Sequence, residues 1–595
     1  MIRSLFCAAI VLLPLASEAQ HLLRAQRVEN SETPADGDGV EEAGNEQFSE
    51  LQQGRRRPGG RAIPDFPPFV YESVPNINST ASHFVPVPDR WRQFYVGKWY
   101  DPYHQNILKG DVPVFGEPGH EWFVELGVIS DTLAERFKIP VPVGVPTTKN
   151  PGTVDTFGNG NFSLFVERVI PSFSLIRGNT VFKPPEFEFR ATPVFSFTSV
   201  DASETGIVRV DPSRGTSRSE GDWSFLELFA DVHLADISER YDFISSRFGV
   251  QEFSSDFRGF VYTDQQPGIR LFGNWDNNKW QYNFAWFPRL KKETNTFVND
   301  TASRHEDVFI WNVYRQDLIA LGHQVQGTVI YREDNAGDKG PYFNDNGLLV
   351  RPTSIGDERA KNIRSTYFGL NGDGHIGRVN TTTSFYYVTG TETHNPIAGR
   401  QQNISAFMFA QELSYDFDWL RVRGSVFWSS GDDDPKDGTA KGFDAINDVP
   451  NFAGGDLSYW QRQGIPLVAG GETFLVNLGS LIPNLRPTKE EGQSNFVNPG
   501  IRLLNVGVDV ELTQELKLIT NASYLQFDET ETLETVRQLG EIGYDLSTGL
   551  IYRPWLNNNV EFRLGGNALL PGDGLEQLYG DKTLYSFFTN MILEY

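Results

Sequence analysis

Apolar and polar residues alternate along the chain from about residue 160 onward, which is the pattern of β-strands with one apolar face. In LLNVGVDVELT at 503–513, Leu504 and Val506 fall on one face, while Asn505 and Asp509 fall on the other. Roughly sixteen to eighteen such segments follow one another at intervals of about 20–25 residues, as strands joined by alternately short and long connections would. The pattern predicts an all-β fold of long antiparallel strands.

The chain ends inside such a segment, on an aromatic residue. Counting back in steps of two gives a nearly apolar face, made of Tyr595, Leu593, Met591, Thr589, Phe587 and Tyr585. A run of about a dozen alternating residues is long enough to cross a bilayer as a tilted strand. The stretch also resembles the C-terminal assembly signal of outer-membrane barrels, in which Phe is the usual last residue. We therefore expect the last strand to close a barrel by pairing with the first.

The N-terminus has the layout of a secretory signal peptide over residues 1–19. Arg3 is followed by an apolar run over 5–16 and by a small-x-small cleavage site that ends at Ala19. The single cysteine, Cys7, lies inside this segment, so the mature chain is expected to have no disulfide and no thiol chemistry. An exported protein without disulfides is common among bacterial outer-membrane proteins.

Two further segments precede the alternating region. Residues 20–65 are acidic and poor in apolar side chains, which predicts a disordered linker. Its basic stretch at 55–61 could contact anionic headgroups or peptidoglycan, or could simply belong to the charged linker. Residues 66–160 are rich in proline and aromatic side chains, and proline at this density excludes central strands. We expect 66–160 to form an irregular extension that plugs the barrel or lies on its periplasmic face, and the barrel to span 161–595.

The apolar faces of the predicted strands could contact lipid or a soluble protein core, and this difference separates a membrane barrel from a soluble β fold. No segment of the mature chain is long and apolar enough for a transmembrane helix, so a membrane-spanning form must be a closed β-barrel. Aromatic residues make up 13% of the chain, which suits the interfacial girdles of such a barrel. A β-propeller would repeat every 40–50 residues or so, and a soluble sandwich would have shorter strands. We therefore expect a transmembrane antiparallel β-barrel of about 16–18 strands.

Charge and fold class together predict the surroundings and partners of this barrel. The formal net charge of −25 argues against nucleic acid as a partner. We expect a location in the bacterial outer membrane, in contact with membrane lipid and lipopolysaccharide. The C-terminal strand would engage the outer-membrane assembly machinery, and polar solutes would occupy the lumen.

Two stretches resemble porin-like outer-membrane barrels of the alginate-export type and related uncharacterised outer-membrane proteins. In SGDDDPKDGTAKGFDAINDVPNFAGG at 430–455, a Ser-Gly-Asp turn leads through a Gly- and Asp-rich loop to Phe443 and Asp444. A pattern typical of strands in such porins is carried by Arg247, Gly249, Gln251 and Phe253. The resemblance covers the barrel and not the extension. It implies a channel, and within the alginate-export type an arginine ladder that could guide a polyanion.

The polar faces of the predicted strands carry charges of both signs. The residues expected to line the lumen are Arg190, Arg270, Arg421, Arg423, Arg502, Arg563, Glu186, Glu188, Asp509 and Glu511. Opposed rows of such side chains could make a transverse field that selects polar or charged solutes. Alternatively, they pair with one another across neighbouring strands and simply line a wet interior. Because both signs are present, the second alternative is favoured.

The sequence gives few indications of metal binding or catalysis. Asp432, Asp434 and Asp437 could bind calcium as an oxygen-rich cluster, although no EF-hand spacing is present and these residues also favour turns. The sequence holds no Gly-x-Ser-x-Gly, no His-Glu-x-x-His and no phosphate loop, and His233 has no recognisable serine partner. We therefore expect no enzyme, and no cofactor other than calcium in that loop.

These observations predict a porin-like channel for passive passage of small or linear polar solutes. The alternative is a barrel that serves as a sleeve or anchor for a periplasmic or electron-transfer partner, with residues 66–160 as the docking segment. Conductance of the purified barrel separates the two functions, because a bound partner would block free passage.

Overall fold

The computed structural model describes residues 107–110, 112–117, 119–141, 159–178, 184–240, 242–353, 355–465, 467, 479–483, 485–533 and 539–595. In these ranges, no helix has both the length and the apolar character needed to cross a membrane. The predictions for residues 1–65 and for most of 66–160 lie outside the described residues.

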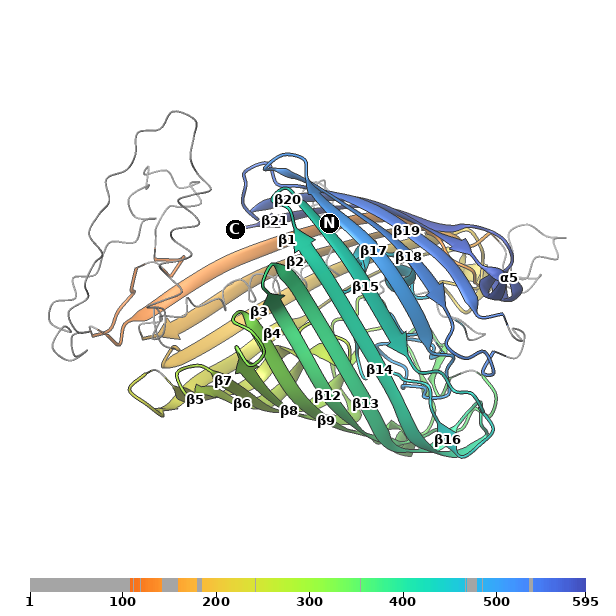
Figure 1. Cartoon of the computed structure of the whole chain (residues 1–595), viewed down its shortest axis with the longest axis horizontal. Coiled ribbons are helices and arrows are strands. Elements are labelled where there is room, and N and C mark those ends of the chain that lie inside the picture. Colours follow the sequence, from red (N-terminus) through yellow and green to blue (C-terminus); the bar gives the residue numbers. More distant parts are fainter. Residues whose placement is uncertain are drawn as a thin grey trace, which may run out of the picture. The chain divides into compact units, whose positions relative to one another are not determined.

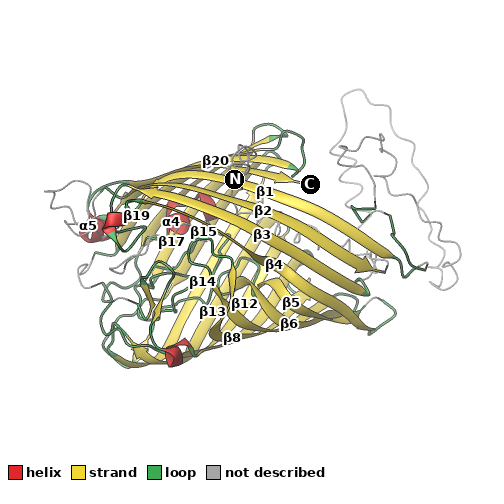
Figure 2. Cartoon of the chain, turned by 180° about the vertical axis from the view of Figure 1, so that it is seen from behind, coloured by secondary structure: helices red, strands yellow, loops and turns green. Residues whose placement is uncertain are grey.

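One antiparallel sheet closes on itself to form a barrel (Figures 1 and 2). The sheet has 19 strands, of which 18 form the wall, because the two-residue β16 pairs only alongside β14. The wall strands are β1 (Trp122–Lys138), β2 (Asn161–Arg177), β3 (Phe187–Ala202), β4 (Ser217–Asp236), β5 (Phe243–Ser254), β6 (Thr263–Trp275), β7 (Trp280–Lys292), β8 (Asn299–Gln316), β9 (His323–Asp334), β12 (Ile363–Ile376), β13 (Val379–Asn395), β14 (Arg400–Asp416), β15 (Leu420–Ser429), β17 (Ile501–Glu511), β18 (Leu516–Gln526), β19 (Glu541–Tyr552), β20 (Val560–Pro571) and β21 (Leu584–Glu594).

Few other elements occur in the described part of the chain. They are the short strands β10 (Tyr342–Phe343), β11 (Leu349–Arg351) and β16 (Thr439–Ala440), the helices α4 (Tyr459–Gln463) and α5 (Asp573–Tyr579), and three single-turn helices at Pro212–Arg214, Ala336–Lys339 and Gly455–Leu457. The all-β prediction is confirmed.

The barrel closes where the last strand meets the first. β21 pairs antiparallel with β1, from Ile129 opposite Glu594 to Lys138 opposite Tyr585. The terminal residue continues this ladder, because the Tyr595 N–H donates to the Val128 carbonyl at 3.0 Å. The expected pairing of last and first strands is confirmed, and it leaves the wall without a free edge in the membrane.

The barrel begins earlier than the sequence pattern predicted. β1 starts at Trp122, inside the range assigned to the irregular extension, so the boundary at residue 161 was wrong. Prolines at 113 and 118 precede this strand and prolines at 140, 142 and 146 follow it, which hid one long strand between two regions that cannot be central strands. The first residues of β1 extend past the end of β21 and pair instead with a segment around 108–115. There the Leu126 N–H donates to the Leu108 carbonyl at 2.7 Å.

Side chains of the wall strands alternate between an apolar outer face and an inner face that carries the charged and polar side chains and, where the inward loops pack, apolar ones such as Ile310, Met408 and Ile501. On β17, Leu504 and Val506 point outward and are each 56% exposed, whereas Asn505 between them is 1% exposed. Outward aromatic residues include Phe195, Phe197, Trp223, Trp311, Phe587 and Tyr595. An apolar outer band with aromatic residues around a polar interior is the architecture of a barrel that crosses a bilayer.

The two ends of the barrel differ in the length of their connections. At the end that holds the C-terminus, short turns join neighbouring strands, such as 276–279, 377–378 and 417–419. At the other end most connections are longer, and 430–500 between β15 and β17 is the longest of them. Short periplasmic turns and long extracellular loops are usual for outer-membrane barrels.

Candidate functional site: loops folded into the barrel lumen

The connection 430–500 is named the lumen loop here, and its described residues (430–465, 467, 479–483 and 485–500) fold into the barrel instead of projecting from it. It joins Ser429 to Ile501, which are direct neighbours in the sheet, so a short turn would have been enough to connect them. Many of its side chains are fully buried, among them Phe443, Tyr459 and Phe496. Figure 2 shows its helix α4 among the strands of the barrel. The loop therefore fills part of the interior.

One part of the lumen loop is fixed to the wall formed by β19, β20, β21 and β1. The Arg462 guanidinium donates to both carboxylate oxygens of Glu135 on β1, at 2.9 and 3.1 Å, and lies 3.7 Å from the ring centroid of Phe588 on β21. Asp545 on β19 accepts the backbone N–H groups of Tyr459 at 3.2 Å and Trp460 at 2.9 Å, where α4 begins. These contacts hold α4 against one side of the lumen.

Another part of the loop reaches the opposite side of the barrel. Arg304 on β8 donates to the carbonyl oxygens of Glu490, at 2.6 Å, and Gly492. Arg332 on β9 donates to the Ser494 hydroxyl at 2.7 Å. In strand order β8 and β9 lie half the barrel away from β20, so the loop crosses the lumen from one wall to the other.

Two shorter connections also fold inward. In 255–262, between β5 and β6, the Arg258 guanidinium donates to the Thr382 hydroxyl at 2.6 Å and lies 3.6 Å from both Asp373 and Glu412. It also donates to the lumen loop at the Asn451 carbonyl, at 3.4 Å. Arg258 thus joins two inward connections to the wall strands β12, β13 and β14.

The second short connection is 293–298, between β7 and β8. Arg168 on β2 donates to the Thr296 carbonyl at 3.1 Å. Phe297 belongs to a buried apolar cluster that includes Phe162 on β2 and Phe588 on β21. Because β7 and β8 lie far from β2 and β21 along the wall, this connection also reaches across the lumen.

The inward loops rest on a buried network of charges at β6 to β9. Glu306 is 1% exposed and accepts hydrogen bonds from Arg289 at 2.9 Å, Arg304 at 2.5 Å and Arg332 at 2.6 Å. Asp264 accepts from Arg289 at 2.9 Å and from Lys292 at 2.7 Å. Buried charges are tolerated only when they are paired and hydrogen-bonded, so this network fixes the geometry of the wall on which the loops sit.

Charged groups of the lumen loop itself are also buried. Asp444 lies 3.5 Å from Arg486, and burial raises the pKa of its carboxyl above the usual range. The Lys489 ammonium donates to the Asp448 carbonyl at 2.5 Å, and burial lowers the pKa of this amine. Both shifts follow from the removal of these groups from water, which penalises the charged form.

The predicted lumen residues fall mostly on the inward face, where they pair with neighbours. Arg190 lies 2.8 Å from Glu188, and Arg423 lies 2.8 Å from Asp509. The other inward members are Arg270, Arg421, Arg563 and Glu511, and Arg270 donates to Asn283 at 2.7 Å. The ion pairs of the described residues follow the second alternative drawn from the sequence, in which both signs pair along the wall.

Two predicted residues lie elsewhere. Arg502 shares the outward face of β17 with Leu504 and donates to Asp528 at 2.6 Å, so its assignment to the lumen was wrong. Successive side chains of a strand point to opposite faces, and Arg502 is two residues before Leu504, so it lies on the same apolar face as Leu504 and Val506. Glu186 lies in the turn before β3 and pairs with Arg177 at 3.3 Å.

The three aspartates of the predicted calcium site do not converge. Within the described ranges, no group of three or more His, Cys, Asp or Glu side chains is placed to hold a metal ion. Asp432, Asp434 and Asp437 each accept a backbone N–H two residues ahead, at 3.1, 3.2 and 2.6 Å, and so stabilise consecutive turns. Burial raises the pKa of Asp432 to about 6. This arrangement does not support the calcium prediction at these residues, which stays a prediction.

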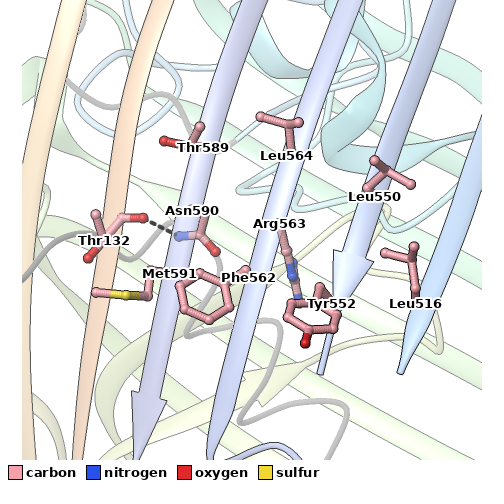
Figure 3. A pocket seen from close by; sticks show the side chains of 10 residues that line it. All are labelled: Thr132, Leu516, Leu550, Tyr552, Phe562, Arg563, Leu564, Thr589, Asn590 and Met591. Carbon is pink, nitrogen blue, oxygen red and sulfur yellow. Dashed lines mark hydrogen bonds between the residues drawn. The ribbon is translucent and has the colours of Figure 1, made fainter. Parts of the chain in front are cut away.

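A groove of about 340 Å³ lies on the outer wall and not in the lumen (Figure 3). Most of its lining residues belong to the outward faces of β18 to β21 and β1; the lining consists of Thr132, Leu516, Leu550, Tyr552, Phe562, Arg563, Leu564, Thr589, Asn590 and Met591. The groove faces the membrane side of the wall, so it is separate from the loops inside.

The sequence pattern did not indicate the residues that build the interior, nor that the described part of the lumen loop folds inward; these residues are Arg258, Arg289, Arg304, Arg332 and Glu306. One signal was available in the loop. The stretch NFAGGDLSYWQ at 451–461 carries large apolar side chains that a water-exposed loop would not need. The long polar connection around it masked this signal.

Comparison with known proteins gives matches among solved structures. Pseudomonas aeruginosa OccK9 (OpdG) matches at 9% identity with a TM-score of 0.42, over 79% of this chain and 98% of that chain. Acinetobacter baumannii OccAB3 matches at 8% identity with a TM-score of 0.42, over 79% of this chain and 99% of that chain. Pseudomonas aeruginosa OccK1 (OpdK) matches at 9% identity with a TM-score of 0.41, over 79% of this chain and 98% of that chain. No family model and no curated protein matches the sequence.

The class of protein rests on the chain's own geometry. A closed wall of 18 antiparallel strands, an apolar outer face and a charged, polar inner face define a transmembrane β-barrel of the bacterial outer membrane.

Proposed function

We propose that the protein is a porin-like channel for passive passage of small polar solutes across the outer membrane. The observation that carries the proposal is the lumen loop, which crosses the barrel between Glu135 and Arg304 and so reduces the cross-section of the lumen. Three inward connections would restrict the size of the solute, since each removes cross-section from the lumen. No step of this function needs a catalytic residue or a cofactor.

The charges on the wall favour small solutes of mixed or no net charge. Arg190, Arg247 and Arg423 each face a carboxylate at 2.8 Å, so little net positive charge is left along these walls to attract a polyanion. The narrower proposal, a channel of the alginate-export type for a linear polyanion, is supported only by the sequence resemblance at 430–455 and 247–253. We further propose that lipid, lipopolysaccharide and the outer-membrane assembly machinery contact the barrel.

Single-channel conductance of the refolded mature chain in a planar bilayer tests this function. We expect steady, ohmic openings with weak ion preference, because lumen charges of both signs are paired. The same chain without residues 20–105 should conduct at least as well. Absence of current from both forms, with the barrel folded by circular dichroism, would contradict the channel. It would favour a barrel that serves as a sleeve or anchor for a partner.

Replacement of Arg258 should widen the passage. In Arg258→Ala the connection 255–262 loses its hydrogen bond to Thr382 and its ion pairs with Asp373 and Glu412, so its tip loosens while Phe260 and Tyr262 stay packed in the apolar cluster. We expect single-channel conductance to rise, by up to about two-fold, with larger current noise. Arg364→Ala, at an exposed pair on the outer face, is the matched control and should conduct like the wild type. Equal conductance of both variants would show that Arg258 does not set the passage.

A further inference from the structure

One carboxylate of the lumen loop lies where three connections of the long-loop end meet. Glu491 is 2% exposed. Its Oε1 accepts hydrogen bonds from the Thr294 hydroxyl at 3.0 Å and from the Tyr342 hydroxyl at 3.4 Å. Thr294 belongs to the inward connection 293–298, and Tyr342 belongs to β10, in the connection between β9 and β12. Glu491 therefore ties the lumen loop to two other loops.

The hydrogen bonds at this junction are too few for an ionised Glu491, whereas Asp345 is exposed and water can hydrate it. The Thr294 hydroxyl also points to Asp345, at 3.4 Å, and accepts the Asp345 backbone N–H at 3.2 Å. A hydroxyl has one proton, so it can donate to Glu491 or to Asp345 but not to both at once. The second oxygen of Glu491, Oε2, is buried and accepts no hydrogen bond from any described residue. A proton on Glu491 would remove the buried negative charge that these few hydrogen bonds compensate poorly.

The charged groups that face Glu491 do not neutralise it by direct contact. Arg351 on β11 and Lys291 on β7 both stack on the Tyr342 ring, each 4.2 Å from its centroid. The Arg304 guanidinium on β8 is already bound to Glu306 and to two carbonyl oxygens of the lumen loop. Asp345 adds a like charge. Burial, with a further contribution from Asp345, raises the pKa of Glu491 to about 7.

Resting on the channel function proposed above, we propose that Glu491 is a proton-binding switch that sets how tightly the lumen loop is held at the mouth of the barrel. With its proton, Glu491 holds the three connections together and the passage is narrow. Without its proton, the carboxylate repels Asp345, the junction loosens and the passage widens. The ligand of the switch is the proton itself.

The sign of the pH dependence follows from the direction of the pKa shift. The packed junction binds the Glu491 proton more tightly than a water-exposed glutamate, whose pKa is 4.5. Below about pH 4.5 Glu491 holds its proton in both the packed and the released junction, and the packed junction is most stable. As pH rises from there to about 7, only the released state loses the proton, so packing weakens progressively. The full shift from 4.5 to about 7 would change the ratio of loose to packed junctions by up to about 300-fold.

The test compares the wild type, Glu491→Gln and Glu358→Gln at pH 5 and pH 8. Single-channel conductance of the wild type should be lower at pH 5 than at pH 8. Glu491→Gln imitates the protonated form, so its conductance should stay at the low level of the wild type at both pH 5 and pH 8. Glu358→Gln removes an exposed glutamate from the same connection as Tyr342 and should keep the pH response. In Asp345→Asn the midpoint should move to lower pH, since the repelling charge is gone.

A second measurement keeps the switch testable if no current is seen. Amide hydrogen exchange of the segment 488–495, corrected for the chemical exchange rate, should be faster at pH 8 than at pH 5 in the wild type and equal in Glu491→Gln. Current without any pH response, or a response that survives in Glu491→Gln, overturns the switch and leaves the channel intact. Absence of current with the expected exchange overturns the channel and leaves the protonation of the junction intact.

Discussion

Removal of the lumen loop is expected to raise single-channel conductance by about three-fold or more, because the loop occupies the cross-section of the barrel. The change replaces residues 431–499 by a short glycine-rich turn. Ser429 and Ile501 are direct partners in the sheet, so a turn of a few residues can join β15 to β17 without moving either strand. The wall strands can therefore pair as before, although inward apolar side chains that now pack on the loop, such as Phe427 and Ile501, become exposed to water.

The loop deletion also exposes groups that the loop now covers. Glu135 and Asp545 lose their partners Arg462 and the start of α4, and both would face water in the wider lumen. Water replaces the lost hydrogen bonds there, so the effect on folding is smaller than it would be in a dry core. Circular dichroism and resistance of the folded barrel to SDS are the measurements that check the wall.

A matched control for this deletion shortens only the exposed tip of another loop at the same end of the barrel. Residues 210–214 form the tip of the connection between β3 and β4, and their replacement by a short turn leaves Ile207 and Val208 in the buried cluster and should change conductance far less. Unchanged conductance after removal of 431–499, with the wall intact, would mean that the passage is narrowed elsewhere. The proposal that the lumen loop selects solutes by size would then fail.

The barrel wall was predictable from the sequence because its physical signal is local. On β21 the alternation from Tyr585 to Tyr595 predicted which side chains face outward, and Phe587 and Tyr595 are each 56% exposed on that face. The same rule shows why Arg502 was misplaced, since its position in the alternation belongs with Leu504 and Val506. The strand β1 was missed because prolines flank it on both sides and alternation alone did not outweigh them.

The interior was not predictable, because it depends on contacts between distant parts of the chain. Arg462 and Glu135 are 327 residues apart in sequence, and nothing local to either one indicates the other. Arg304 and Gly492 are 188 residues apart. Length and composition showed that 430–500 is a long polar connection, which describes an extended surface loop equally well. Only the large apolar residues near 451–461 distinguished it from such a loop.

Loss of the Glu306 carboxylate is expected to destabilise the barrel by about 3 kcal/mol, near the lower end of the range for a broken buried ion pair. Glu306 accepts hydrogen bonds from Arg289, Arg304 and Arg332, and these four side chains are at most 2% exposed. Glu306→Gln keeps the shape of the side chain but leaves three buried guanidinium groups without their shared anion. Equilibrium unfolding in urea, with the barrel refolded in lipid vesicles, measures the change.

The size of this effect depends on what each arginine retains. Arg289 keeps Asp264 at 2.9 Å, and Arg332 keeps Asp334 at 2.9 Å, so no guanidinium is left without a carboxylate except Arg304, which retains only carbonyl partners. Glu333→Gln is the control, because Glu333 pairs with Arg364 at 2.8 Å on the exposed outer face, where a pair contributes less than about 1 kcal/mol. If both variants lost the same small amount, the interior at β7 to β9 would have to be wet, and the buried network could not be what holds the lumen loop to this wall.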